Sequence, residues 1–308
     1  MSEALYCKHG IKHSDSSDVL VLNSPRVSVL MPVFDSAKYL RESIHSVLTQ
    51  SYEDFEFLIG DDCSNDSSYE IARESSVHDK RVRVFKSHEN TGVAQTLNSL
   101  IGQSRGTYIV RMDADDICCT ERVGVQIQEI ERSGADLVFG HATLIDEEEN
   151  EICRIFTPTL KECLLALPQK CFFIHPTAVI RRSVFDKYGP YNERYRHGQD
   201  WELWKRLYPS ARFGMVEMVV LKYRLNSKSV TQTRLKSNQK SLDFEAAKAC
   251  LRNFDRRNYQ KYLRGLKNSQ KLVVEFARFM RYYQFRLFWH KHRARVSIWW
   301  HGDTLTNR

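Results

Sequence analysis

The chain alternates between short apolar runs and stretches in which apolar residues recur every three or four positions. Runs rich in β-branched and apolar residues predict strands at 26–32, 55–60, 81–85 and 107–112. Between them, spacing such as that of Leu40, Ile44 and Val47 predicts helices with one buried face. Three strand–helix repeats that end at a fourth strand indicate an α/β fold with a largely parallel sheet.

After residue 116 the pattern is less regular. It predicts, in order, a helix at 123–130, a strand at 137–139, a hairpin of 141–146 and 151–156, a short helix at 160–167, a strand at 178–180, a helix capped by Ser183 and closed by Gly189, a helix that begins within 195–204, a strand at 215–221 and a polar loop at 223–230. The second half therefore adds further strands and helices to the same sheet.

The two ends of the chain differ from its middle. Residues 1–24 are polar and predict a loosely held N-terminal extension, and residues 25–234 form the predicted α/β domain. Residues 235–308 have helical spacing and hold 17 Lys and Arg against 5 Asp and Glu, a net +12, which leaves −4 of the chain's +8 for the rest. This asymmetry indicates an anionic partner for the C-terminal region, such as a membrane surface or a nucleic acid.

Aromatic residues lie beside basic ones in this region, for example Trp299 and Trp300 after Arg293 and Arg295, which suits a bilayer interface. A helical hairpin packed on the core, with a solvated basic face, fits the same pattern. No run of about eighteen apolar residues and no secretory signal is evident, so we expect neither a membrane-spanning helix nor export. The 8 cysteines are scattered and predict reduced thiols in a cytoplasmic protein.

The densest chemical signal is the sequence Asp113-Ala114-Asp115-Asp116, which follows the strand at 107–112 directly. Like charges so close repel one another unless a cation lies among them. Mg²⁺ or Mn²⁺ binds one or two carboxylates and completes its shell with phosphate oxygens and water. The stretch therefore suggests a metal–diphosphate site at the carboxyl end of a strand, where open α/β sheets bind ligands. A solvated turn in which Asp116 caps the next helix is the alternative.

Further polar residues follow other predicted strands. Asp61 and Asp62 come after the strand at 55–60, where a carboxylate can accept a hydrogen bond from a ring N–H or a ribose hydroxyl. Gly92 opens a helix whose N-terminus can receive a phosphate or simply be capped. Asp200 lies near the start of another helix, where either a cap or a catalytic carboxylate is favoured by the helix dipole.

Several of these stretches, in this order, resemble the inverting family-2 glycosyltransferases of GT-A fold, which move a sugar from a nucleotide-diphosphate donor to an acceptor hydroxyl. The matching stretches are 27–34, 61–62, 90–94, 113–115, 175–177, 189–193 and 199–201, so the resemblance covers about residues 26–230. It implies a Rossmann-like mixed sheet flanked by helices, followed here by a C-terminal helical extension. Any single stretch is weak evidence, but the ordered set is specific.

The resemblance also implies roles for individual residues. Pro32 and Phe34 line the pocket of the base, Asp62 accepts from a ring N–H of uracil, and Asp61 supports it. Gly92 lies at the nucleotide. Asp113 holds the ribose or helps to orient the metal, and Asp115, with Asp116 as a second candidate, binds Mn²⁺ or Mg²⁺ at the diphosphate. Asp200 is the general base that deprotonates the acceptor hydroxyl.

Two positions depart from the family pattern. The usual Asn after the aromatic residue is Asp35, and the usual acidic residue before the base is Gln199. The second change removes a negative charge beside Asp200 and should lower the pKa of that carboxyl relative to a paired acid site. Because Asp200 itself is retained, we expect an active, metal-dependent enzyme of the hexosyl- or N-acetylhexosaminyltransferase class.

The expected product is a polysaccharide, glycolipid or glycan, made on a saccharide or lipid-linked acceptor in the cytoplasm, with the basic C-terminal region in peripheral contact with the inner face of a membrane. Two other functions stay open. A sugar-phosphate nucleotidyltransferase usually has a Gly-rich, basic phosphate loop after the first strand, and Val33-Phe34-Asp35-Ser36 lacks one. A non-catalytic nucleotide-sugar or nucleic-acid binder fits the basic tail, but the core is acidic and has no usual RNA-binding signature, so no nucleic acid is expected.

Overall fold

The computed structural model describes residues 24–155 and 157–225. The predicted N-terminal extension, the loop residues 226–230 and the whole basic C-terminal region lie outside the described residues. Within the described part, no helix is long and apolar enough to cross a membrane.

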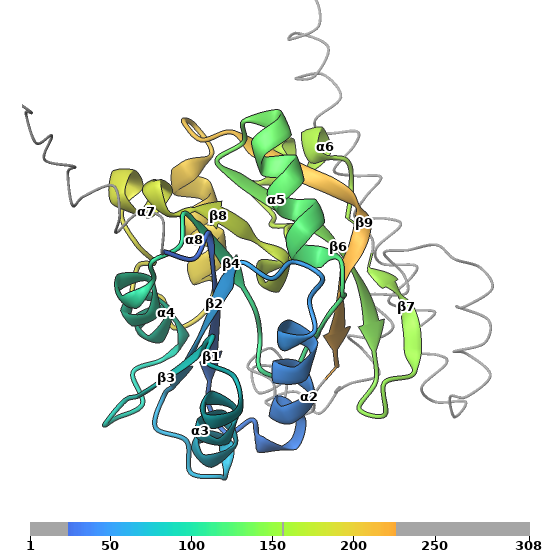
Figure 1. The fold of residues 1–308 in the computed structure, drawn as a ribbon. Helices are drawn as coiled ribbons and strands as arrows, with labels where there is room; N and C mark the ends of the chain where they lie inside the picture. The colour runs from blue at the N-terminus through green and yellow to red at the C-terminus, as the bar shows by residue number, and fades with distance from the viewer. Residues whose placement is uncertain (1–23, 156, 226–308) are drawn as a thin grey trace, which may run out of the picture.

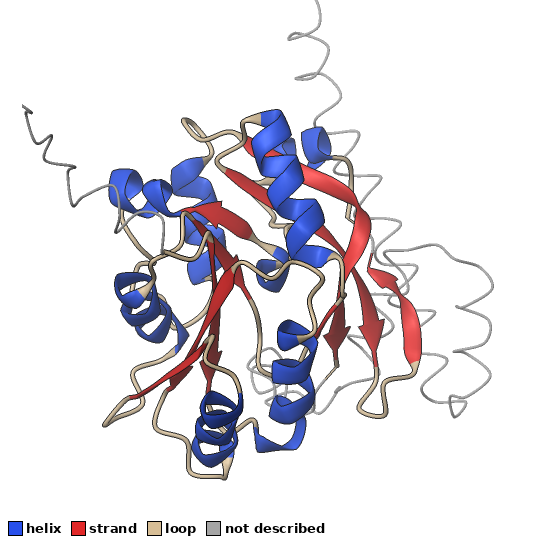
Figure 2. Ribbon diagram, viewed as in Figure 1, coloured by secondary structure: helices blue, strands red, loops and turns tan. Residues whose placement is uncertain are grey.

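A nine-stranded mixed sheet forms the centre of the described part, and helices cover both of its faces (Figures 1 and 2). The strands are β1 (Val27–Val33), β2 (Phe55–Asp61), β3 (Val82–Lys86), β4 (Tyr108–Arg111), β5 (Ile117–Cys118), β6 (Leu137–Ile145), β7 (Glu151–Ile155), β8 (Val179–Arg181) and β9 (Phe213–Arg224). Their order is β3-β2-β1-β4-β8-β6-β9-β5, and β7 pairs with β6. This confirms the mixed α/β sheet that the resemblance implies.

The first four strands run parallel to one another, as the repeated strand–helix pattern predicts. The sheet becomes mixed at β8, which is antiparallel to both β4 and β6. β9 is parallel to β6 and antiparallel to the short strand β5. Because β4 is the last of the parallel set, the loop after it lies where the direction of the strands changes.

The helices divide between two buried clusters, one on each face of the sheet. They are α2 (Ala37–Leu48), α3 (Ser68–His78), α4 (Val93–Gln103), α5 (Arg122–Ser133), α6 (Leu160–Ala166), α7 (Arg182–Tyr188) and α8 (Gln199–Leu207), with a 3₁₀ turn at His175–Thr177. Apolar residues of α2, α3 and α5 pack on one face, and those of α4, α6, α7 and α8 pack on the other. Figure 1 shows this two-sided covering.

Three details differ from the sequence-based expectations. The predicted strand at 137–139 and the first hairpin strand are one continuous strand, β6. β9 extends through Arg224, although a loop from residue 223 was expected, because its last residues pair with β6. Ser183 does not cap α7, since that helix begins one residue earlier, at Arg182, and follows Arg181 in an extended conformation.

Glycine is required at one close approach within this sheet. A Cβ at position 106 would lie 2.6 Å from the backbone N of Ser28 and 2.7 Å from the carbonyl carbon of Val27. The Gly106 N–H in turn donates to Ser28 Oγ at 2.9 Å. This contact fixes the start of β4 against β1 and thereby the register of the strand that leads to the carboxylates.

Candidate functional site

The carboxyl ends of β2, β1 and β4 lie at one edge of the sheet, because these neighbouring strands are parallel. Asp61 ends β2 and Asp62 follows it, Phe34 follows β1, and Asp113 lies two residues after β4. The structure thus brings together the sequence-predicted residues of three separate stretches. Such an edge is the usual ligand site of an open α/β sheet.

Asp61 and Asp62 have different surroundings, although both are buried. Asp61 Oδ2 accepts from the Ser64 N–H at 3.2 Å, whereas its Oδ1 is buried and has no hydrogen-bond partner in the described part of the chain. An unsatisfied carboxylate oxygen is costly in a folded protein, so it marks a position that a donor group can occupy.

Asp62, in contrast, is already engaged by the turn before α4. Its Oδ1 accepts from the Thr91 N–H at 2.9 Å and from Thr91 Oγ1 at 3.0 Å, and its Oδ2 accepts from the Gly92 N–H at 2.8 Å. The Gly92 N–H is therefore directed to this carboxylate. Gly92 has φ +90°, a conformation in which glycine is favoured, so Asp62 and Gly92 together fix the entrance to α4.

Phe34 is 45% exposed and directly follows β1, the strand that contains Pro32. The next residue, Asp35, has φ +46°, and its carboxylate accepts from the Asn65 N–H at 2.7 Å. Aspartate is among the residues that tolerate this left-handed conformation. The departure from the family's Asn is therefore accommodated by a turn that presents the Phe34 ring at the surface.

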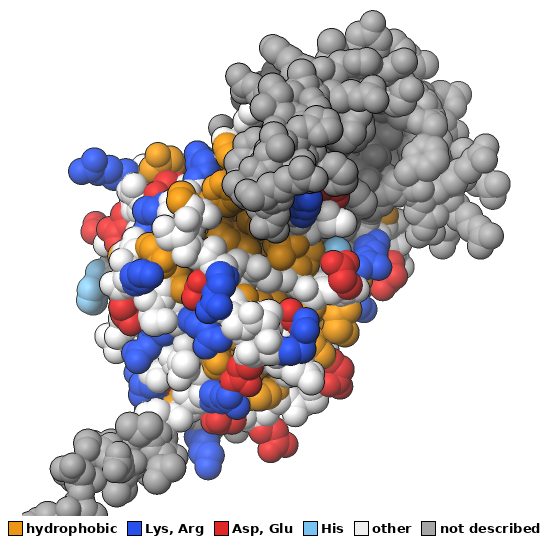
Figure 3. Space-filling view, turned by 90° about the horizontal axis from the view of Figure 1, so that it is seen from above, with side chains coloured by type: hydrophobic (Ala, Val, Ile, Leu, Met, Phe, Trp, Pro, Cys, Tyr) orange, Lys and Arg blue, Asp and Glu red, His pale blue; other side chains and the backbone are white. Residues whose placement is uncertain are grey.

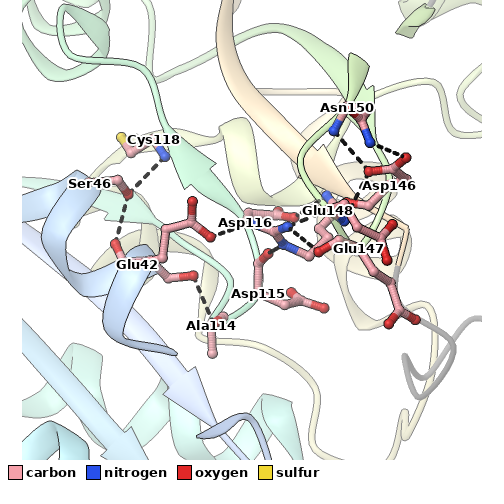
Figure 4. Close-up of polar contacts among 12 residues, drawn as sticks. Glu42, Ser46, Ala114, Asp115, Asp116, Cys118, Asp146, Glu147, Glu148 and Asn150 are labelled. Atoms are coloured by element: carbon pink, nitrogen blue, oxygen red, sulfur yellow. Dashed lines mark hydrogen bonds and ion pairs between the residues drawn. The ribbon is translucent and has the colours of Figure 1, made fainter. Parts of the chain in front are cut away.

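The loop after β4 is held by hydrogen bonds from the helix α2 and from the strand β9. Ser43 Oγ, from α2, donates to the Ala114 carbonyl at 2.9 Å. From β9, the Arg224 N–H donates to Asp116 Oδ1 at 2.8 Å, and Arg224 Nε donates to the Asp115 carbonyl at 2.8 Å. Figure 4 shows how closely Asp115 and Asp116 lie to the β6–β7 hairpin. Asp116 is therefore bound to β9 and does not cap the following helix.

Arg224 also joins this loop to α2 and to the hairpin. Its Nη2 donates to Glu42 Oε2 at 2.5 Å, and its Nη1 donates to the carbonyls of Asp146 and Glu147 at 3.4 and 3.3 Å. Burial is the main cause that raises the pKa of Glu42, to about 7, and neighbouring Glu149 also raises it, while Arg224 opposes the change. Arg224 is thus a buried counter-ion for the carboxylate of Glu42.

The surroundings of the carboxylates after β4 bear on whether they can hold a metal ion. Asp116 is 1% exposed, and burial, followed by Asp115 and Asp113, raises the pKa of its carboxyl well above the usual range. No group of three or more His, Cys, Asp or Glu side chains in the described residues is arranged to hold a metal by itself. The residues fit a cation that shares one or two carboxylates with the phosphates of a ligand, which is the common mode for Mg²⁺.

Asp113 forms an ion pair with a buried arginine. Arg111 Nη2 lies 2.6 Å from Asp113 Oδ1, and the arginine side chain is 4% exposed. A second bond joins Arg111 Nη1 to the carbonyl of Met112. Asp113 is thereby oriented by the last residue of the strand that precedes it.

Asp200 lies in the first turn of α8, directly after Gln199 and one position beyond the start of the helix. Burial is the main cause that raises the pKa of its carboxyl, and Asp113 raises it further, whereas backbone N–H groups and Arg111 lower it. The charges of Asp113 and Arg111 therefore act on the carboxyl of Asp200 in opposite directions. A partly buried carboxyl with a raised pKa is suited to accept a proton near neutral pH.

Two of the sequence motifs, 175–177 and 189–193, are in contact with each other. His175 Nε2 lies 2.9 Å from the hydroxyl of Tyr191, and burial, followed by Arg111, lowers the pKa of His175 well below its usual value. Asn98 of α4 holds the turn that carries Tyr191, through bonds to its N–H and carbonyl at 2.9 Å each. The histidine is thus neutral, and the His175–Tyr191 pair adds no charge near Arg111.

Sequence reasoning missed Arg111, Arg224 and Glu42. A signal for Arg111 existed, because an arginine at the end of an otherwise apolar strand, beside three carboxylates, must find a buried partner. Arg224 had no such signal, since it was expected in a loop and its partner Asp116 is 108 positions away. Glu42 gave no signal either, because its place in the sequence is typical of a residue on the exposed face of a helix.

Comparison with known proteins agrees with this arrangement. The family model for "Glycosyl transferase family 2" matches residues 28–189. An uncharacterized glycosyltransferase of Methanocaldococcus jannaschii is 31% identical over 225 residues, which cover 71% of this chain and 77% of that protein. The O-antigen biosynthesis glycosyltransferase WbnJ of Escherichia coli is 28% identical and is covered over 97% of its length, with 81% of this chain.

Two solved structures share the fold at low identity. TarS 1–349 of S. aureus, in complex with UDP, has a TM-score of 0.54 and 18% identity, with 80% of this chain and 77% of that chain covered. The mannosyltransferase PcManGT of Pyrobaculum calidifontis, in complex with GDP-Man and Mn²⁺, has a TM-score of 0.56 and 14% identity, with 89% and 85% covered.

Proposed function

The chain belongs to glycosyltransferase family 2, and from that premise we propose that it moves a hexosyl or N-acetylhexosaminyl group from a UDP-linked sugar to an acceptor hydroxyl, with inversion at the anomeric carbon. One observation carries this proposal. The carboxylates that follow β4 lie at the edge of the sheet where the parallel strands β2, β1 and β4 end, and the charges of Arg111 and Asp113 both act on the carboxyl of Asp200 in α8. A direct transfer needs a donor site and an acceptor base in one region, and this arrangement supports that.

On the donor side, the base is proposed to lie beside Pro32 and Phe34, with the exposed Phe34 ring available for stacking. Asp61 offers an unpartnered buried oxygen, and a uracil N3–H is a donor of suitable type. The sequence favoured Asp62 for that bond, and the role stays a prediction for both residues. The contacts of Asp62 support an additional role, in which it holds Gly92 at the entrance to α4.

On the phosphate side, Asp115 is the first candidate and Asp116 the second to hold Mn²⁺ or Mg²⁺ together with the diphosphate. A cation bound there would supply positive charge to the departing diphosphate. Asp113 is proposed to hold the ribose or to help to orient the metal, and the ion pair with Arg111 fixes the Asp113 carboxylate. Arg224 keeps Asp115 and Asp116 in place through their backbone and side chain.

On the acceptor side, Asp200 is proposed to take the proton of the attacking hydroxyl as the oxygen bonds to the anomeric carbon from the face opposite the diphosphate. Attack from that face inverts the configuration. The raised pKa of Asp200 suits this task, because a base is most effective when its proton affinity is close to the working pH.

The acceptor is proposed to be a saccharide or a lipid-linked saccharide in polysaccharide, glycolipid or glycan biosynthesis, in keeping with the similarity to an O-antigen glycosyltransferase. Residues 25–234 would form the catalytic domain, and the basic region 235–308 would bring it to an anionic membrane from the cytoplasm. Acidic and basic side chains are interspersed on the face of the described part seen in Figure 3, so that face offers no continuous basic surface.

The test separates turnover from binding. Asp200→Asn should keep the affinity for the nucleotide diphosphate and lose transfer by about 10²–10⁴-fold, the usual contribution of a general base. Glu202→Gln is the matched control, because Glu202 lies in the same helix and pairs with Arg206. Transfer should be measured as nucleotide release with a panel of nucleotide sugars and extracted acceptors. Full turnover in Asp200→Asn would contradict the proposed base.

A further inference from the structure

The end of β9 lies beside the loop that carries the proposed metal ligands and beside the β6–β7 hairpin. Arg224, the last residue of β9, is paired in register with Ile145, the last residue of β6. Its side chain is 1% exposed, and its guanidinium carbon lies 4.6 Å from the centroid of the Tyr39 ring. A buried guanidinium needs partners for its N–H groups, so the contacts of Arg224 decide which segments it joins.

The Arg224 side chain binds three segments that are distant from one another in the sequence. Its Nε donates to the Asp115 carbonyl at 2.8 Å, and its Nη1 donates to the carbonyls of Asp146 and Glu147 at 3.4 and 3.3 Å. Its Nη2 donates to Glu42 Oε2, in α2, at 2.5 Å. The carbonyls carry no net charge, so among the described residues Glu42 is the carboxylate that forms an ion pair with this cation.

The turn of the β6–β7 hairpin is held by its own hydrogen bonds in the form that meets Arg224. Asp146 Oδ1 accepts from the Asn150 N–H at 2.8 Å, and Asp146 Oδ2 accepts from Asn150 Nδ2 at 3.0 Å. Figure 4 shows this turn next to the loop after β4. An ion pair of 2.5 Å between Lys38 and Glu147 ties the same turn to α2. The hairpin, the loop after β4 and α2 are therefore joined at one guanidinium.

We propose that Glu42 is a positioning residue for the donor site, whose carboxylate fixes the Arg224 guanidinium, which in turn holds the backbone of Asp115 so that the Asp115 carboxylate can share a cation with the diphosphate. This inference rests on the proposed role of Asp115 as a metal ligand. It assigns to Glu42 no contact with the cation or with a substrate. Side chains that orient a metal ligand from behind typically contribute about 10–100-fold to metal affinity.

Two parts of the donor affinity should respond differently to the loss of Glu42. The base is proposed to lie at Phe34 and Asp61, whereas the bonds of Arg224 described above go to α2, the loop after β4 and the hairpin. The affinity for UDP without metal should therefore stay close to that of the wild type. The factor by which Mn²⁺ strengthens UDP binding should fall. A merely structural role would lower Tm and leave this factor unchanged in the folded protein.

Three variants test this coupling. Glu42→Ala removes the charged partner of the guanidinium and should reduce the Mn²⁺ factor by about 10-fold or more. Glu42→Gln keeps an acceptor oxygen without the charge, so it should retain more of the factor than Glu42→Ala does. Arg224→Lys keeps the charge but lacks the planar fork that reaches all three segments, so it should also reduce the factor. Each variant keeps the backbone N–H of residue 224, which donates to Asp116.

The experiment is calorimetric titration of the full chain with UDP, with and without Mn²⁺, together with the Tm of each variant. The pH is set about one unit above the pKa of Glu42, which burial raises to about 7, so that this carboxyl is largely ionised. Arg181→Lys is the matched control. Arg181 is also a strand arginine whose guanidinium binds backbone carbonyls, those of Ala135 and Ile130, and it pairs with Tyr108 at the opposite end of β4. This control should leave the Mn²⁺ factor unchanged.

The Glu42 side chain is 33% exposed, so both of its variants should fold and carry the test even if Arg224→Lys does not. A Mn²⁺ factor in Glu42→Ala equal to that of the wild type would overturn the inference and leave the proposed function intact. An equal loss of the factor in Arg181→Lys would overturn it too, since the effect would then reflect a general loosening of the sheet. A wild-type chain that binds UDP without any effect of Mn²⁺ would overturn both the inference and the proposed metal role of Asp115.

Discussion

The contacts of Asp62 predict that this residue stabilises the fold as well as the site. Its carboxylate accepts three hydrogen bonds, two from backbone N–H groups and one from a hydroxyl, at 2.8 to 3.0 Å. The Asp62 side chain is 4% exposed, so these bonds form largely away from water. Asp62→Ala would leave the N–H groups of Thr91 and Gly92 unsatisfied at the entrance to α4.

The magnitude follows from these contacts. A hydrogen bond to a charged group contributes about 1.5–3 kcal/mol, and loss of a helix cap costs up to about 2 kcal/mol. The three bonds converge on one side chain and are not additive, so we expect Asp62→Ala to lower the free energy of unfolding by about 3 kcal/mol. For a domain of about 200 residues this corresponds to a fall in Tm of roughly 6–12 °C.

The assay is denaturant and thermal unfolding of the ligand-free protein, followed by circular dichroism. Asp61→Asn is the matched comparison, because it keeps an acceptor for the Ser64 N–H and removes a buried charge. It should change the free energy of unfolding by less than about 1 kcal/mol. If Asp62→Ala loses less than about 1 kcal/mol, the turn before α4 does not depend on this carboxylate and the structural role is refuted.

Three further predictions concern packing and pH. Gly106→Ala should destabilise the protein by about 1–3 kcal/mol in denaturant unfolding, since its Cβ would meet the backbone of Ser28, whereas Gly102→Ala, in open space, should not destabilise it. Burial raises the pKa of Glu42 from 4.5 to about 7, so the native state binds a proton more tightly than the unfolded state does. Stability should therefore fall as the pH rises between these values. This slope should appear when Tm is measured against pH and should be absent in Glu42→Gln. The pKa of Glu56 shifts in the opposite direction: burial alone would raise it, but hydrogen bonds from the Arg105 N–H and from the side chains of Ser28, Arg83 and Arg105 together lower it. The stability that Glu56 contributes is therefore present above the pKa of the unfolded state and is lost in acid. Glu56→Gln should show a shallower acid transition.

The order of elements was predictable because it depends on local signals. Apolar runs gave the parallel strands, and the helix closed by Gly189 was found from a turn residue that does adopt a positive φ. Carboxylates after parallel strands were expected to meet, and the sheet order brings them to one edge. The local pattern could not give the hydrogen-bond partner of each carboxylate. That partner can come from a distant part of the chain, and the sequence around a carboxylate does not show which residue it is.

Asp116 illustrates this limit. The sequence allowed a metal ligand or a helix cap, and the structure adds a hydrogen bond to the backbone of Arg224 in a strand whose end was not foreseen. The short strand β5 was missed for the same reason, since two residues carry no periodicity and pair with β9 only in three dimensions. Asp62 was interpreted from the resemblance as a base-binding residue, while its hold on Gly92 follows from tertiary contacts.

The most direct test of the central claim is calorimetric titration of the protein with a panel of nucleoside diphosphates, with and without Mn²⁺. UDP is expected to bind, Mn²⁺ to strengthen its binding, and Asp115→Ala to abolish this effect of the metal. Mn²⁺ alone is expected to bind only weakly, since no all-protein metal cage is present in the described residues. Absence of binding of any nucleoside diphosphate to the folded protein would contradict the claim that the carboxylates after β4 form a donor site.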